Sequence, residues 1–340
     1  MINQWIKLLS IAVLLVFVGL IVAFKSEPVK KAKKQEANDS QKQNWANEPI
    51  LPIPADVDLD ARKVALGEKL FNDPQFSHDN TISCASCHSL SLGGTDQLPR
   101  SIGVNGQRGA INAPTVFNAV YNFKQFWDGR AESLEEQIDG PTHSAAEMGS
   151  NWEEIVQKLR NSSEYVSAFS PLYNQGIEIN NIKDAIATYE RSLVTPDSRF
   201  DQFLRGDQNI LTADEKEGYR VFKSVGCISC HQGINVGGNL FEEFGVMGNY
   251  FTDRGSVTEA DLGRFNVTKK ESDKHVFKVP SLRNVALTKP YFHDGSAETL
   301  EDAVSVMSKY QLGRQLSAQE IDSIVKFLKT LSGEYKRENL

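Results

Sequence analysis

Two copies of a Cys-x-x-Cys-His motif constrain this 340-residue chain more than any other feature of its sequence. Together the copies use all four cysteines, and they read Cys84-Ala85-Ser86-Cys87-His88 and Cys227-Ile228-Ser229-Cys230-His231. The spacing is that of covalent c-type haem attachment, in which both thiols bond to one porphyrin and the histidine ligates its iron. A zinc site or a dithiol redox pair would use the same residue types, but two identical motifs with no spare cysteine favour haem. We therefore expect two covalently bound haem c groups.

The segments around the two motifs are repeated as well. Residues 113–118 (Ala-Pro-Thr-Val-Phe-Asn) resemble residues 279–284 (Val-Pro-Ser-Leu-Arg-Asn), and residues 126–135 resemble residues 292–301 at the same offset. Before each motif, the run Gly67–Phe71 is echoed by the run Gly218–Phe222. We therefore predict a mainly α fold of two tandem cytochrome c-like domains, each wrapping one covalently bound haem.

The ends of these domains follow from changes in composition. We expect a signal-anchor or transmembrane segment over residues 1–25, a flexible linker over 26–50, an N-terminal haem domain over 51–200 and a C-terminal haem domain over 201–340. The apolar run from Leu8 to Phe24 is at the lower limit for spanning a bilayer, and a removed signal peptide is the alternative. Because haem c is attached outside the cytoplasm, we expect a periplasmic protein tethered to the inner membrane by an uncleaved helix.

Local patterns are helical. The runs Thr212–Glu215 and Ser317–Glu320 have the form of capping boxes. Apolar residues at helical spacing predict a helix from Ile182 to Val194 that ends before Pro196. No stretch shows sustained alternation of apolar and polar residues, so no sheet is predicted.

The offset between the repeats allows the sixth iron ligand to be compared. Met307 follows the second copy of the repeated segment, and a methionine there completes a His/Met iron suited to electron transfer. The corresponding position of the first copy is Pro141, within a predicted loop from Gly140 to Met148 that carries Glu147. An iron without a strong sixth ligand can bind a small substrate, and a nearby carboxyl can transfer protons.

Residues 51–332 resemble the bacterial di-haem cytochrome c peroxidase family. The matching runs lie at residues 79–84, 92–94, 112–115, 125–130, 147–148, 193–196, 277–284, 291–295 and 311–313. The resemblance implies reduction of hydrogen peroxide to water at the N-terminal haem, held by Cys84, Cys87 and His88. Electrons from a small cytochrome c or a cupredoxin would enter at the C-terminal haem, held by Cys227, Cys230, His231 and Met307.

The same resemblance assigns further residues. Glu147 matches the family's acid–base residue, Gln137 its polar partner and Trp127 the aromatic residue between the haems. One calcium ion is implied between the domains, at Asn112, Thr288 and Pro290. A homodimer is implied too, and no nucleic-acid partner is expected.

The chain departs from the family at one position. Many members carry a histidine after Ser-Ile-Gly that closes the resting peroxidatic iron, whereas this chain has Val104. We therefore expect the first iron to be open without prior reduction, with His143 as the nearest other cap. Two other functions stay open: a membrane-tethered di-haem electron carrier, and an enzyme that oxidises a protein substrate, whose members have tyrosine where Met307 stands.

Overall fold

The computed structural model describes residues 48–55 and 57–336, and helices dominate this part of the chain. The helices are α3 (Ala61–Phe71), α4 (Cys84–Cys87), α5 (Leu134–Gln137), α6 (Asp139–His143), α7 (Trp152–Arg160), α8 (Ser163–Phe169), α9 (Ile179–Ser192), α10 (Arg199–Leu204), α11 (Ala213–Val225), α12 (Tyr250–Arg254), α13 (Phe265–Thr268), α14 (Leu300–Tyr310) and α15 (Ala318–Lys329). The strands are β1 (Phe241–Glu243) and β2 (Val276–Lys278).

The predicted anchor and most of the predicted linker lie outside the described residues. Within the described ranges, no helix is long and apolar enough to cross a bilayer. The prediction for Leu8–Phe24 therefore stays a prediction from the sequence.

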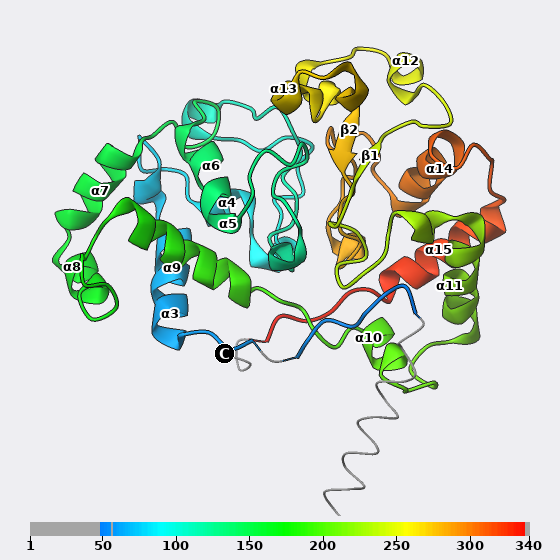
Figure 1. The fold of residues 1–340 in the computed structure, drawn as a ribbon, viewed down its shortest axis with the longest axis horizontal. Coiled ribbons are helices and arrows are strands. Elements are labelled where there is room, and N and C mark those ends of the chain that lie inside the picture. Colours follow the sequence, from blue (N-terminus) through cyan, green and yellow to red (C-terminus); the bar gives the residue numbers. More distant parts are fainter. Residues whose placement is uncertain (1–47, 56, 337–340) are drawn as a thin grey trace, which may run out of the picture. The chain divides into compact units, whose positions relative to one another are not determined.

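Two helices cross near the first haem motif: α3 precedes the motif in the sequence and α9 follows it. Helices α3 and α9 pack against each other so closely that a Cβ at Gly67 would lie 2.0 Å from the carbonyl oxygen of Ala185. Only glycine permits this approach, because any side chain at residue 67 would overlap the backbone of α9. Figure 1 shows α3 and α9 crossing, with the first motif in α4 nearby.

The second motif has an equivalent pair. A Cβ at Gly218 in α11 would lie 1.9 Å from the carbonyl oxygen of Ser323 in α15. Tyr189 of α9 and Phe327 of α15 both face the glycine of their partner helix. The two glycines that the sequence repeat aligned thus perform the same packing role in the two halves.

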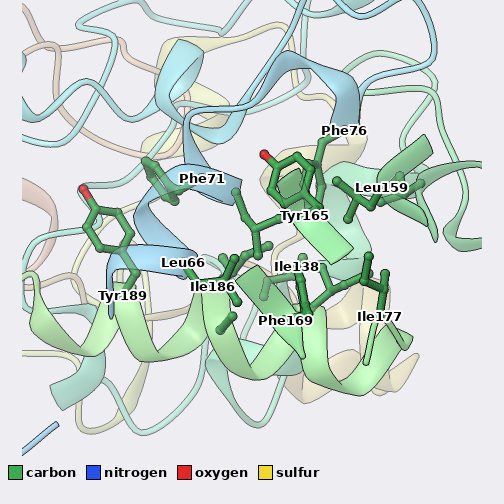
Figure 2. Packing of buried hydrophobic residues seen from close by; sticks show 14 of the residues in the cluster. Leu66, Phe71, Phe76, Ile138, Leu159, Tyr165, Phe169, Ile177, Ile186 and Tyr189 are labelled. Atoms are coloured by element: carbon green, nitrogen blue, oxygen red, sulfur yellow. The ribbon is translucent and has the colours of Figure 1, made fainter. Parts of the chain in front are cut away.

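Aromatic and aliphatic side chains fill the space around each crossed pair. Around α3 and α9, Phe71 packs edge to face on Tyr189 with ring centroids 5.3 Å apart, and Leu66 and Ile186 complete the contact (Figure 2). Around α11 and α15, the buried cluster is separate and includes Phe222. Burial of apolar surface is the main stabilising contribution here, at about 25 cal/mol per Å².

The repeat is also present in the backbone. Phe126 and Phe292 both adopt a left-handed conformation, with φ of 67° and 70°, and Gly129 and Gly295 share a φ of 65°. The side-chain amides of Asn118 and Asn284 both donate to the hydroxyl of Thr195, over 2.8 and 3.1 Å. Thr195 thus lies where the two copies meet. The predicted fold class, two tandem cytochrome c-like domains, is confirmed.

Several local predictions can be compared with the structure. The capping boxes at Thr212 and Ser317 open α11 and α15. The helix predicted over 182–194 is α9, which begins three residues earlier and ends at Ser192. The predicted loop over 140–148 was wrong in its first part, because α6 extends to His143. Pro141 is tolerated there because the first turn of a helix leaves its N–H groups unbonded.

The antiparallel pair of β1 and β2 was not predicted. Phe241 is opposite Lys278 and Glu243 is opposite Val276 in the pair. Strands of three residues are too short to show the alternation by which a strand is recognised in sequence.

Candidate functional site

Each haem motif forms one tight helical turn, α-helical in the first and 3-10 in the second. In the first, the amide of His88 donates to the carbonyl of Cys84 over 3.0 Å. In the second, the amide of His231 donates to the carbonyl of Cys227 over the same distance. Each turn therefore holds two thiols and an imidazole within one short segment.

The two imidazoles are oriented by backbone carbonyls. The Nδ1 atom of His88 lies 3.2 Å from the carbonyl oxygen of Gly94, and Nδ1 of His231 lies 3.3 Å from that of Val236. Since a carbonyl only accepts, Nδ1 carries the proton and Nε2 is left as a ligand atom. Burial lowers the pKa of His88, and it lowers that of His231 to about 4. Both rings are therefore neutral at physiological pH, the form that binds a metal.

The four thiols are unsuited to a dithiol redox role. Burial is the main reason that the pKa of each cysteine is raised, to about 11 for Cys87 and for Cys227. Reactive redox cysteines have lowered pKa values, because the thiolate is the attacking form. The environment of these thiols thus supports covalent attachment to a cofactor over disulfide exchange.

The second motif lines a large cavity. Cys227, Cys230 and His231 line this cavity together with Met307 of α14. The other walls are largely apolar and include the side chains of Phe222, Val279, Leu282, Ile324 and Leu328. Two thiols, an imidazole, a thioether and an apolar wall are the donor set and surroundings that a haem c requires. The residues present fit this group.

Val104 occupies the position at which many family members have a histidine, and it contacts the segment that carries Glu147. The amide of Val104 donates to the carbonyl of Glu147 over 2.8 Å, and the Val104 side chain is buried. A Cβ at Gly149 would lie 3.1 Å from a methyl group of Val104. Valine offers no atom that could ligate iron. His143, the other candidate cap, is exposed.

Glu147 has the environment of an acid–base residue. Burial raises the pKa of its carboxyl, while the Arg130 charge and the Ser144 hydroxyl act in the opposite direction. The Glu147 charge in turn contributes to the raised pKa of Cys87, so the carboxyl lies near the attachment site. Gln137, the last residue of α5, is half-buried, and its side chain makes no hydrogen bond to any residue that the structure describes.

Trp127 belongs to the first repeat but lines the cavity of the second. Its indole N–H donates to the carbonyl of Asn112 over 3.0 Å, and its ring centroid is 6.3 Å from that of His293. The amide of Lys278 donates to the Trp127 carbonyl over 2.8 Å. The indole is therefore fixed between the two repeats.

The residues expected to bind calcium, Asn112, Thr288 and Pro290, all line the same cavity. The Asn112 amide donates to the carbonyl of Leu98 over 2.8 Å, and this leaves its side-chain oxygen available as a ligand. The Thr288 hydroxyl donates to the carbonyl of Val285 over 3.2 Å.

Sequence reasoning missed a buried charged network beside Trp127. His293 and Asp261 are both buried, with Nε2 of His293 2.7 Å from a carboxylate oxygen of Asp261. Arg254 pairs with Asp261 over 2.7 Å and also with Asp294. Two acids and a histidine lie close enough to hold a metal ion, but the guanidinium already supplies the positive charge. The one available signal was the repeat, in which His293 corresponds to Trp127.

Comparison with known proteins agrees with this geometry. Residues 61–209 match the model of a family described as di-haem cytochrome c peroxidase. The chain is 50% identical over 307 residues to the cytochrome c peroxidase Ccp of Escherichia coli, covering 90% of this chain and 65% of that protein. It is 47% identical over 290 residues to the cytochrome c551 peroxidase of Nitrosomonas europaea, covering 85% of each chain.

Solved structures give the same result. A crystal structure of a MauG-like protein associated with microbial copper homeostasis is similar, with a TM-score of 0.73 and 30% identity. The similarity covers 85% of this chain and 94% of that one. The diheme peroxidase BthA of Burkholderia thailandensis shares the fold, with a TM-score of 0.67 over 82% of this chain and 87% of that one, at 22% identity.

Proposed function

The chain belongs to the di-haem cytochrome c peroxidase family, and we propose that it reduces hydrogen peroxide to water with electrons from a small redox protein. Each turnover consumes one peroxide, two electrons and two protons, and releases two waters. The observation that carries the proposal is the difference between the two motifs. Met307 lines the cavity of the second motif. The first motif instead has a half-buried acid nearby, Glu147, whose carbonyl accepts from the amide of Val104, a residue that cannot ligate iron.

A haem held by Cys84, Cys87 and His88 would supply the iron that passes electrons to the peroxide. The protein side of the reaction is proton transfer. With a pKa raised by burial, the Glu147 carboxyl can take the proton from one peroxide oxygen and return it to the other, which becomes water. The amide of Gln137, which has no partner among the described residues, is free to orient the peroxide by hydrogen bonding.

We propose that electrons enter through the C-terminal domain and pass Trp127 on their way to the N-terminal one. The support is the position of this indole, which belongs to the first repeat and lines the cavity of the second. Its hydrogen bond to Asn112 and its contact with His293 hold the ring in one orientation. A small cytochrome c or a cupredoxin is the expected donor.

Further parts of the proposal rest on the family resemblance and on the sequence. One calcium ion is proposed at Asn112, Thr288 and Pro290, and a homodimer is proposed as the assembled form. Because haem c is attached outside the cytoplasm, we propose a periplasmic location. The apolar run before the described residues is proposed as the tether to the inner membrane.

The absence of a histidine at Val104 leads us to propose that this enzyme works from its fully oxidised state. Val104 is buried against the Glu147 loop and offers no ligand atom. A ferric spectrum in which both haems are six-coordinate and low-spin would contradict this part of the proposal.

The experiment is peroxide-dependent oxidation of a reduced small c-type cytochrome by protein that carries both haems. We expect Glu147→Gln to lower kcat/KM for peroxide by about 10²–10⁴-fold, the usual contribution of a general acid–base residue. Glu153→Gln is the matched control, because Glu153 is exposed on α7. Oxidation at wild-type rate by Glu147→Gln would refute the role of this carboxyl. Absence of any oxidation by the wild type would instead indicate an electron carrier.

A further inference from the structure

A lysine is buried at the wall of the C-terminal haem cavity. Lys278 is the last residue of β2, and its amide is held by the Trp127 carbonyl. Only 7% of its surface is exposed. It lines the cavity together with Cys227, His231 and Met307. Fully buried lysines are rare in proteins unless they are paired with an anion.

The ammonium group of Lys278 is bonded to no such anion among the residues that the structure describes. Its side chain makes no hydrogen bond or ion pair with any residue of the described chain. Burial alone lowers its pKa, to about 8, and no carboxylate opposes this effect. At neutral pH the group is therefore still mainly a cation. A buried charge without a counter-ion is strongly destabilising, so a negative group is expected to approach it when the site is complete.

The repeat shows that this cation belongs to the second site alone. Lys278 corresponds to Asn112 in the first copy, because Lys278-Val279-Pro280 aligns with Asn112-Ala113-Pro114. The side-chain amide of Asn112 is neutral and donates to the carbonyl of Leu98. The sequence around the two positions is similar, so the charge is not a requirement of the turn itself.

A haem c brings two propionate carboxylates into its cavity, and these are the anions that the site lacks. We propose that the ammonium of Lys278 is the counter-ion of a propionate of the haem attached to Cys227 and Cys230, and that it raises the reduction potential of this haem. The inference rests on the haem-binding part of the proposed function. A nearby carboxylate favours the ferric over the ferrous state, and a cation that neutralises it removes this preference.

The test is the midpoint potential of the His/Met haem, measured by spectroelectrochemical titration without peroxide. We expect Lys278→Met to lower the potential, with roughly a tenfold shift in the ferric-to-ferrous ratio at a given potential, or about 59 mV for one electron. Lys278→Arg keeps the charge and should stay close to the wild type. Lys270→Met is the matched control, because it removes the same charge at an exposed position.

An unchanged potential in Lys278→Met, with the spectrum of the methionine-ligated haem retained, would overturn the inference. Should this variant not incorporate its haem, Lys278→Gln replaces it, and the same two outcomes apply. A crystal structure of the haem-loaded protein gives a second measurement. The inference predicts a propionate oxygen within roughly 4 Å of Nζ of Lys278, and a larger separation would contradict it. Because no peroxide is used, failure here would leave the proposed peroxidase reaction standing.

Discussion

A buried carboxyl on α9 makes the stability of the N-terminal domain depend on pH. Glu190 is 8% exposed, and its Oε2 atom has no hydrogen-bond partner within the described part of the chain. Glu190 corresponds to Leu328 of the second repeat. Each comes directly after the aromatic residue that packs on the glycine of the partner helix, Tyr189 on Gly67 and Phe327 on Gly218. Leu328 lines the C-terminal haem cavity, so Glu190 is an acid at a position where the second repeat has a leucine.

Burial, reinforced by the nearby charge of Glu135, raises the pKa of Glu190 from 4.5 to about 8. The unfolded chain therefore releases this proton near pH 4.5, whereas the folded chain keeps it until about pH 8. The raised carboxyl pKa stabilises the folded state fully below pH 4.5, and this stabilisation declines as the pH rises from 4.5 to about 8. Between about pH 5 and pH 7, this loss amounts to ~2.5 kcal/mol of unfolding free energy.

The assay is urea unfolding of the haem-loaded protein, for the wild type and Glu190→Gln, at about pH 5 and pH 7. Glutamine has nearly the same shape but does not ionise. The stability of the variant relative to the wild type should therefore increase by ~2.5 kcal/mol between these two pH values. Glu153→Gln, on the exposed face of α7, should show no such change. A variant whose difference from the wild type is the same at both pH values would refute the reasoning.

Two further substitutions test the fold. Asp201 and Arg283 form a fully buried ion pair at 2.8 Å, and Asp201→Asn leaves the guanidinium without its counter-ion. We expect a loss of about 3–5 kcal/mol of unfolding free energy in urea titrations. Gly218→Ala places a methyl group 1.9 Å from the carbonyl oxygen of Ser323. We expect it to force α11 from α15, to cost at least about 1–3 kcal/mol and to reduce haem incorporation at the second motif, measured by haem absorbance per protein.

Controls for these two variants are available in the chain. Asp214 pairs with Lys326 at the surface, and Asp214→Asn should cost less than about 1 kcal/mol. Gly109→Ala adds a Cβ with no contact shorter than 3.7 Å and should leave haem incorporation unchanged. If Asp201→Asn cost no more than Asp214→Asn, the buried ion pair would not stabilise the fold as stated. If Gly218→Ala incorporated haem as well as Gly109→Ala, the close packing of α11 on α15 would not be required.

Sequence reasoning succeeded where the information was periodic or repeated. The offset between the copies aligned Phe126 with Phe292, and these two residues share a left-handed backbone conformation. The similar runs before the two haem motifs paired Gly67 with Gly218, and the two glycines share one packing role. Capping boxes predicted the starts of α11 and α15, because this signal is contained within four residues.

The remaining features depend on contacts between distant residues. The burial of Lys278 and Glu190 could not be predicted, because each charge is buried by segments far away in the sequence. The same holds for the network of Arg254, Asp261 and His293, because His293 lies 32 residues after Asp261 in the sequence. The sequence repeat aligns Lys278 with Asn112. It does not show that the Lys278 ammonium has no counter-ion among the described residues.

The measurement that tests the central claim most directly is the first turnover of fully oxidised protein carrying both haems. The protein is mixed with hydrogen peroxide and an excess of reduced small c-type cytochrome, and oxidation of the cytochrome is followed from the moment of mixing. We predict immediate oxidation without a lag in the wild type, and a rate lower by about a hundredfold or more in Glu147→Gln. Oxidation that begins only after the protein has been reduced, or equal rates in both proteins, would contradict an open N-terminal site served by Glu147.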